Sequence, residues 1–468
     1  MDFFPRIALW TGAKRSIRGK RSTGVGRSGN EAAGGWRAHG FADELWVLNV
    51  HRFSEVPVRV TTLFRRLLGV SDLLVEKVQL SEDGLVLRVR PRWRRPRCGE
   101  CGRRAPLEDR ARPRRWRHLG LGAIRLWLEY QPRRVLCRRC GGIRVERVPW
   151  AVHQSRFTEP FEELVGYLAQ VTDKTKVTKL MGISWATVGR IVERVVARRL
   201  DPARLDDLKR IGIDEFSYRR RHRYLTTVVD HERRRIVWAA KGHSAATLKA
   251  FFEELGPERC AKIEVATIDM AGGYISAIEQ CLPRARVVFD RFHVQRLVGD
   301  ALDKVRREQL VELRGTPEGK ELFRTRFALL KNPWNLTRYE HKKLSQVQRT
   351  NAPLYRAYLL KETLAQALDY RQPKRAKQAL KEWLSWASRS KLKPFVKAAR
   401  TIRKHMHGIL AYIDDRMTNG IVEGFNNRLR MIARRAFGFH GSQPLIAMLF
   451  LCCGGIELDP PLPRPPQT

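Results

Sequence analysis

Three acidic residues, far apart in the chain, are placed where they could bind divalent cations together. Asp214 lies in the apolar run 211–216, Asp269 follows the apolar run 263–268, and Glu423 lies beside two asparagines much further along. Carboxylates held close together need a cation to neutralise them, and Mg2+ prefers oxygen ligands. A single Asp at a strand end is more often a turn residue. The ordered set is more specific, so we expect a magnesium site.

Residues 419–430 have the pattern of a helix with one polar and one apolar face. Steps of three, four and seven residues put these polar side chains on one face: Glu423, Asn426, Asn427 and Arg430. The apolar face carries Val422, Phe425, Leu429 and Ile432. Adjacent asparagines near two glycines have poor helix propensity, which indicates a chemical role for the polar face. The alternative is a surface helix on which Glu423 is a solvated charge.

The segment after Lys209 contains the elements that would position the two aspartates. Strands are expected over 211–216, 224–229, 235–240, 263–268 and 286–289, with helices over 245–255 and 272–281. Three meandering strands, a helix, a fourth strand, a second helix and a fifth strand are the order of an RNase H-like α/β core. In that order, acids on the first strand and at the end of the fourth meet at one edge of the sheet.

Two cysteine pairs form a separate candidate metal site. Cys98 and Cys101, and then Cys137 and Cys140, are each separated by two residues. Four such thiolates can complete a tetrahedral zinc site, and nothing in the sequence reads as a secretory leader that would favour disulfides. We therefore predict a structural Zn2+ in a small β module. The basic run 110–117 of that module is expected to contact phosphate groups.

Residues 173–192 have the pattern of a helix-turn-helix. A short helix ends at Gly182, and Ser184 caps a second helix. The exposed side of the second helix would present four residues to a DNA major groove: Trp185, Thr187, Arg190 and Arg194. An ordinary helical hairpin is the alternative, but the basic surroundings favour DNA binding.

The charge of the chain points to a polyanionic partner. Its 468 residues include 91 Lys and Arg against 48 Asp and Glu, a formal net charge of +43. No stretch approaches the roughly 18 consecutive apolar residues of a membrane-spanning helix. We therefore expect double-stranded DNA rather than a membrane as the partner. The expected location is the cytoplasm, in association with the nucleoid.

The composition and the motifs predict a multidomain α+β protein. We expect these parts: 1–57, a flexible basic tail or a mis-assigned start; 58–150, a zinc-binding β module; 151–205, a helix-turn-helix domain; 206–294, the first part of an RNase H-like catalytic core; 295–416, an all-α insertion; 417–455, the C-terminal helix of the core; and 456–468, a disordered tail. The insertion either packs against the core or clamps DNA beside it.

Four strings of the sequence together resemble the bacterial insertion-sequence transposases of the ISL3 family. They lie at 211–216, 289–294, 419–427 and 434–439. The order of zinc module, helix-turn-helix and DDE catalytic core is also similar, and the resemblance extends from about Val58 to Cys453.

The resemblance implies that Asp214, a second aspartate and Glu423 hold the catalytic magnesium ions. Strand order favours Asp269 as the second aspartate, and we select it. The pair Asp290 and His293 resembles an auxiliary motif beside the site, although Asp290 could instead cap a helix and His293 could be structural. The remaining accessory candidate is Asn427.

The activity implied is that of a DDE transposase. Such an enzyme binds the terminal inverted repeats of its element and uses two Mg2+ ions to cleave and transfer DNA strands. Because two ends must be paired, the working form on DNA is expected to be a homodimer or larger. Two alternatives are a transposase-derived DNA-binding regulator without catalysis and an RNase H-like nuclease.

Overall fold

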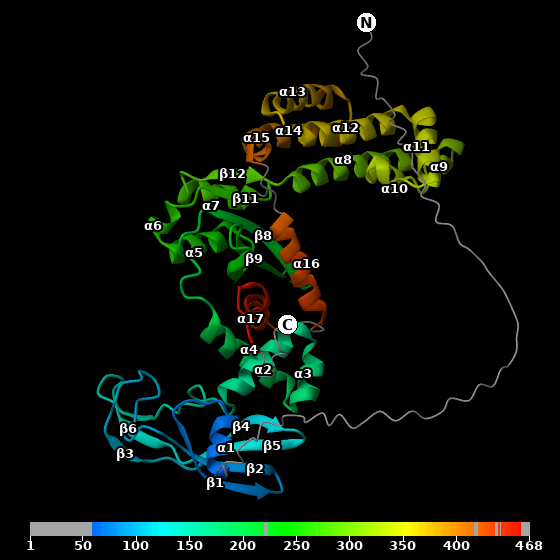
Figure 1. Ribbon diagram of the computed structural model, residues 1–468. Coiled ribbons are helices and arrows are strands. Elements are labelled where there is room, and N and C mark those ends of the chain that lie inside the picture. The colour runs from blue at the N-terminus through cyan, green and yellow to red at the C-terminus, as the bar shows by residue number, and fades with distance from the viewer. Residues whose placement is uncertain are drawn as a thin grey trace, which may run out of the picture. The chain divides into compact units, whose positions relative to one another are not determined.

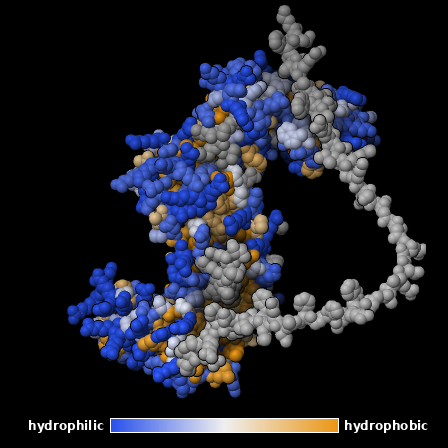
Figure 2. Space-filling view, viewed as in Figure 1, coloured by the Kyte–Doolittle hydropathy of each residue, from blue (hydrophilic) through white to orange (hydrophobic). Residues whose placement is uncertain are grey.

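A computed structural model (Figure 1) describes residues 59–219, 223–270, 272–415, 420–435, 439 and 441–459. The expected tail 1–57 and most of the expected tail 456–468 lie outside these residues. Glu423 belongs to a described helix, but its side chain lies outside the description. Hydrophilic residues cover most of the described surface on the face shown in Figure 2, in keeping with the high charge. Among the described helices, none is long and apolar enough to cross a membrane.

The first module is built from two small sheets and one helix. Helix α1 (Val60–Leu67) precedes a four-stranded sheet in the order β1 (Leu73–Ser81), β2 (Gly84–Pro91), β5 (Ile124–Tyr130) and β4 (Arg114–Leu121). The second sheet contains β3 (Leu107–Arg110), β6 (Arg133–Leu136) and β7 (Ile143–Val145). A two-residue turn at Glu82 and Asp83 joins β1 to β2, where Ser81 pairs with Gly84. Gly84 is needed there because a β-carbon would lie 2.3 Å from the carbonyl oxygen of Arg125.

Three helices follow the first module: α2 (Glu159–Val171), α3 (Lys174–Met181) and α4 (Trp185–Arg199). The predicted helix ends are confirmed. Gly182 terminates α3 in the left-handed conformation, with φ of 58°. Ser184 caps α4, and its hydroxyl accepts a hydrogen bond from the Thr187 backbone N–H.

A five-stranded sheet forms the centre of the next module. Its order is β10 (Arg235–Lys241), β9 (Arg223–Asp230), β8 (Arg210–Arg219), β11 (Val265–Ile268) and β12 (Arg286–Phe289). The helices after β10 and β11 are α5 (Ala245–Leu255), α6 (Pro257–Cys260) and α7 (Gly272–Cys281). The predicted strands and the two main helices are therefore present. β9 is antiparallel to both neighbours, whereas β11 is parallel to β8 and β12.

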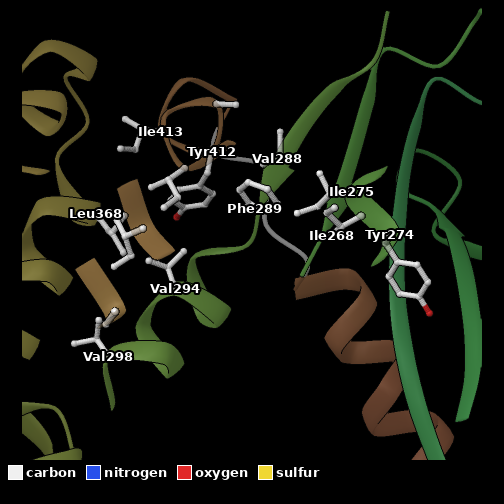
Figure 3. Close-up of a cluster of buried hydrophobic side chains, with 14 of the residues drawn as sticks. Ile268, Tyr274, Ile275, Val288, Phe289, Val294, Val298, Leu368, Tyr412 and Ile413 are labelled. Carbon is white, nitrogen blue, oxygen red and sulfur yellow. The ribbon is translucent and has the colours of Figure 1, made fainter. Parts of the chain in front are cut away.

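The chain from β12 to residue 415 is helical wherever it forms regular structure. Its elements are α8 (Arg291–Glu312), α9 (Pro317–Glu321), α10 (Arg326–Leu330), the 3-10 turn η1 (Pro333–Asn335), α11 (Arg338–Thr350), α12 (Ala352–Asp369), α13 (Pro373–Arg389), α14 (Lys393–Lys404) and α15 (Met406–Asp415). One hydrophobic core joins these helices to the sheet. Figure 3 shows Phe289 of β12 in this core together with Val294 of α8, Leu368 of α12 and Tyr412 of α15. Helix α15 comes closest to Phe289 at Gly408, where a β-carbon would lie 2.3 Å from the ring.

The last two helices, α16 (Gly420–Arg435) and α17 (Ser442–Cys453), return to the sheet and to the three-helix module. Leu429 and Ile432 of α16 share a hydrophobic core with helices α2 and α4 and with strand β9. Gln170 at the end of α2 donates hydrogen bonds to the carbonyls of Leu451 and Ile456, at 2.6 and 3.0 Å. The C-terminal helices therefore contact both the sheet and the helix-turn-helix.

Candidate active site and DNA-binding surfaces

The strand register places the first two predicted acids level with each other, Asp214 within β8 and Asp269 just past the end of β11. Parallel strands β8 and β11 pair with Gly212 opposite Thr267. Asp214 lies two residues beyond Gly212, and Asp269 lies two residues beyond Thr267. Because side chains alternate between faces with a period of two, both aspartates occupy equivalent places at one edge of the sheet.

Asp214 is held by two hydrogen bonds in a buried environment. Its Oδ2 accepts from Asn426 Nδ2 at 2.6 Å, and its Oδ1 accepts from the Glu215 backbone N–H at 2.7 Å. Burial raises the pKa of the Asp214 carboxyl, and the nearby charge of Asp269 raises it further. These effects make it unfavourable for Asp214 and Asp269 to be ionised together without a cation. A bound cation would offset that cost.

His293 is the predicted accessory residue that the structure brings to Asp269. Its Nδ1 lies 3.2 Å from Asp269 Oδ2. Asp290 instead caps α8: its Oδ1 accepts from the backbone N–H of Phe292 at 3.2 Å, and its side chain is buried. The capping alternative considered for Asp290 is therefore the geometry observed, and it orients the first turn of α8 on which His293 lies.

Helix α16 contributes Asn426 rather than Asn427 to this site. Asn426 is 5% exposed and contacts Asp214, whereas Asn427 is exposed and accepts a hydrogen bond from Arg430 at 2.7 Å. The two asparagines expected on one polar face are therefore separated: Asn426 lies in the site, and Asn427 faces solvent. Glu423 occupies the position one helical turn before Asn426. That spacing was the signal that could have identified Asn426 from the sequence.

A further acid, Glu215, was not singled out from the sequence. It pairs across the strands with Thr226, whose Oγ1 lies 2.7 Å from the hydroxyl of Tyr274 on α7. Burial raises the pKa of the Glu215 carboxyl, and the charges of Asp214 and Asp269 raise it further. Because neighbouring strand residues point to opposite faces, Glu215 interacts with Tyr274 of α7 while Asp214 contacts Asn426 of α16.

The carboxylates fit a divalent cation site. Asp214 and Asp269 offer oxygen ligands of the kind that Mg2+ prefers. The Oδ1 atom of Asn426 is buried and has no hydrogen-bond partner among the described residues, so it is a further oxygen beside Asp214. A buried polar oxygen without a partner is uncommon unless water or an ion completes it.

The four predicted cysteines meet in one cluster. Their sulfur atoms all lie within 4.8 Å of one another, with Cys98 and Cys140 3.9 Å apart and Cys101 and Cys137 3.6 Å apart. A tetrahedral zinc ion with Zn–S bonds of about 2.3 Å requires sulfur separations of about 3.8 Å. The backbone N–H of Cys140 lowers the pKa of the Cys137 thiol to about 7. The cluster is therefore arranged as a zinc site.

The predicted DNA-reading residues of α4 have different environments. Arg190 is exposed, but Arg194 contacts the fully buried Glu162 of α2, with Nη2 and Oε1 2.6 Å apart. Trp185 lies under the Lys174 ammonium, 3.6 Å from the ring centroid, and burial lowers the pKa of Lys174 to about 8.

The fourth of these residues, Thr187, lies with its hydroxyl 2.8 Å from that of Ser184. Arg190 therefore remains the most exposed of the four candidates.

Part of the basic run 110–117 holds the zinc module to the helix-turn-helix. Arg117 donates to the carbonyl of Gly182 at 3.0 Å, and its guanidinium lies over the ring of Phe161. Trp116 is buried, and Arg114 lies over its ring. These side chains therefore have structural contacts, which the charge pattern alone did not indicate.

Family models match consecutive parts of the chain. The zinc-finger of transposases IS204, IS1001, IS1096 and IS1165 matches residues 94–140. The helix-turn-helix domain of transposase family ISL3 matches residues 146–196. The ISL3 transposase domain matches residues 211–449, which include the sheet and both C-terminal helices up to Leu449.

Curated relatives extend over most of the chain. The transposase for insertion sequence element IS1557 of Mycobacterium tuberculosis is 40% identical over 432 residues, which are 85% of this chain and 96% of the relative. The transposase for insertion sequence element IS1001 of Bordetella parapertussis is 31% identical over 374 residues, 79% of this chain and 92% of the relative. Because three family models match in succession and these relatives are similar over most of the chain, the chain belongs to the ISL3 family of insertion-sequence transposases.

Proposed function

We propose that this transposase cleaves DNA at the ends of its insertion sequence and joins the freed 3′ hydroxyl to target DNA. Asp214, Asp269 and Glu423 hold two Mg2+ ions in this proposal. The observation that carries it is the placement of Asp214 and Asp269 at equivalent register positions of neighbouring parallel strands, with α16 against Asp214. Glu423 is assigned through its position one turn before Asn426 on that helix.

The chain's own groups set up the reaction. When bound, a pair of magnesium ions activates the attacking oxygen and stabilises the leaving 3′ oxygen. Asn426 fixes one oxygen of Asp214, and His293 lies against Asp269, so both carboxylates have defined orientations. Water is the nucleophile for cleavage, and the DNA 3′ hydroxyl is the nucleophile for transfer. No protein nucleophile is required.

The fold proposed for this catalytic core is RNase H-like. Its support is the strand order β10-β9-β8-β11-β12, with three antiparallel strands followed by two parallel ones. Residues 295–416 are then an all-α insertion between the fifth strand and the last catalytic helix. The boundaries 58–150, 151–205, 206–294 and 417–455 describe the remaining modules of the proposal.

The zinc ribbon and the helix-turn-helix are proposed to bind the inverted repeats at the element's ends. Arg190 faces solvent on the second helix, as a side chain that reads a major groove must. Pairing two ends requires at least two copies on DNA, so a homodimer is the smallest working complex. The name of each curated relative, a transposase for an insertion sequence element, supports this role.

Cleavage of duplexes carrying the element's own ends, with Mg2+ or Mn2+, tests the proposal. The wild type is compared with Asp269→Asn, Asp290→Asn and Glu423→Gln. We expect cleavage at the ends, its loss in the Asp269 and Glu423 variants, and a smaller effect for Asp290→Asn. If folded wild type binds the ends without cutting them, the protein is instead a transposase-derived DNA-binding regulator.

A further inference from the structure

A cavity lined by both charged and apolar side chains begins at the first turn of α8, beside the proposed active site. Its volume is about 310 Å3, and Phe292, Gln295 and Asn332 are among the residues that line it. Two contacts connect it to the aspartates. The ring of Phe292 meets the ring of His293 with centroids 5.6 Å apart, and His293 contacts Asp269 at 3.2 Å.

The wall of this cavity is rigid. Val294 and Val298 on the adjacent face of α8 are buried in the core with Leu368 (Figure 3), so the helix cannot turn freely. On the opposite wall, Lys361 donates to the carbonyls of Leu330 and Lys331, at 3.4 and 3.0 Å. The cavity is therefore held open by packed elements.

The charges that line the cavity balance. Its acids are Asp300, Asp303 and Glu362, and its cations are Arg296, Arg326 and Lys361. A phosphate group would meet the three carboxylates, which disfavour a second anion. A neutral ligand with several hydrogen-bonding groups meets no such opposition.

The polar groups offer both donors and acceptors to such a ligand. The side-chain oxygen of Gln295 accepts hydrogen bonds from Arg291 Nη2 and Nε, each at 3.2 Å. In this orientation, the NH2 group of the same amide can donate to a ligand. The Asn332 side chain is exposed and makes no helix-capping hydrogen bond. Oε1 of Glu362 is buried and, although 2.6 Å from the Lys361 ammonium, has no hydrogen-bond partner of acceptable geometry among the described residues.

Phe292 provides a stacking surface at the mouth of the cavity. Its side chain is 48% exposed, so one face of the ring is open to a ligand. The Phe292 ring can stack on a flat ligand, and the neighbouring donors and acceptors can form hydrogen bonds with its edge. A planar heterocycle meets both conditions. Enzymes that act on extruded nucleotides read them by this combination of stacking and hydrogen bonding.

We infer that this cavity receives one unpaired base of the DNA end, extruded from the duplex next to the phosphate that is cleaved. The inference rests on the proposed function, which supplies the DNA at this edge of the sheet. A volume near 300 Å3 is at the lower end of the range for small-ligand pockets, so it admits a single base and excludes a duplex. Extrusion would fix the position of the scissile phosphate relative to Asp269.

The test compares duplexes in which one base at a time, within a few nucleotides of the cleaved phosphate, is replaced by an abasic site. Phe292→Ala is expected to lower cleavage of the intact duplex about tenfold, and Phe292→Trp to restore it. At one abasic position the wild type and Phe292→Ala should cleave at equal rates, because there is no base to stack. Tyr339→Ala removes another exposed aromatic side chain of the helical region and serves as the control.

Two results would overturn the inference. The first is that Phe292→Ala cleaves the intact duplex as fast as the wild type. The second is that Phe292→Ala cleaves more slowly than the wild type by the same factor at every abasic position. If the wild type cleaves no duplex, the proposed function fails, but the cavity can still be tested with cleavage-deficient Asp214→Asn protein. A 2-aminopurine at one position should then brighten on binding, and adding Phe292→Ala should abolish that change.

Discussion

Asn426 on α16 donates a 2.6 Å hydrogen bond to Asp214 on β8, across 212 residues of sequence. This bond stabilises the ionised form of a carboxyl whose pKa is raised by burial. Together with the Glu215 backbone N–H, which donates to the other oxygen, it fixes the orientation of the Asp214 carboxylate. Asn426 therefore controls the geometry of Asp214 from a distant part of the sequence.

Replacing Asn426 with Ala should lower the rate of DNA cleavage about 10- to 100-fold and raise the Mg2+ concentration needed for half-maximal rate. Asp214 must be ionised to bind a cation, so the rate falls as the pH drops through its pKa. Loss of the Asn426 hydrogen bond raises that pKa, and the fall should move to higher pH. The measurement is the pH and Mg2+ dependence of single-turnover cleavage.

Asn427→Ala is the matched control, because Asn427 is exposed and contacts Arg430. It should leave both dependences close to those of the wild type. Equal effects of the two substitutions would show that Asn426 has no special role in positioning Asp214.

Arg194 and Arg190, one turn apart on α4, should respond differently to substitution by Ala. Removing Arg194 leaves the buried Glu162 with Arg198 as its remaining cation, and should lower the free energy of unfolding by about 3 kcal/mol. Removing the exposed Arg190 should leave stability within about 0.5 kcal/mol and weaken end binding roughly tenfold. Urea unfolding and DNA titration at several salt concentrations distinguish the two. An Arg190 variant with normal affinity would remove this residue from the DNA interface.

The zinc cluster should be needed for end binding. Cys137→Ser is expected to lower bound zinc from one ion per chain to near zero and to abolish binding of the inverted repeats, because the ribbon has little core besides the metal. Metal analysis and gel-shift titration measure the two effects. Cys281→Ser changes a cysteine outside the cluster and should retain both zinc and binding. Zinc retained by Cys137→Ser would contradict the ligand assignment.

Gly408 should tolerate no side chain. A methyl group there would lie 2.3 Å from the Phe289 ring, so Gly408→Ala should destabilise the protein by about 1–3 kcal/mol. Phe289→Leu in the same chain should recover part of that loss by shortening the opposing side chain. Gly299 has open space at its β-carbon position, and Gly299→Ala should be neutral or slightly stabilising. Urea midpoints of the variants provide the comparison.

The elements were predictable from the sequence because their signals are local. Apolar runs identified strands β8 and β11, and capping residues identified the ends of α3 and α4. The position of Asp269 relative to Asp214 followed from strand order. Each of these inferences depends on a few consecutive residues or on the sequence of elements.

Side-chain partners were less predictable. Spacing placed both asparagines of α16 on one face, but a step of one residue rotates the helix by about 100°, and that step separates the buried Asn426 from the exposed Asn427. Arg194 fitted a DNA-reading pattern, yet its partner Glu162 lies 32 residues earlier on another helix. Contacts between elements depend on packing, which periodicity does not encode.

The contacts of α16 and α17 bear on how the protein is synthesised. These helices complete both the hydrophobic core of the helix-turn-helix and the surroundings of Asp214, and they are synthesised after the elements that they complete. A nascent or prematurely terminated chain would lack this shared core, and with it the packing that supports DNA reading and strand cutting alike. The two capacities would therefore mature together, so an incomplete translation product would be neither an unguided nuclease nor a competitor for the element's ends.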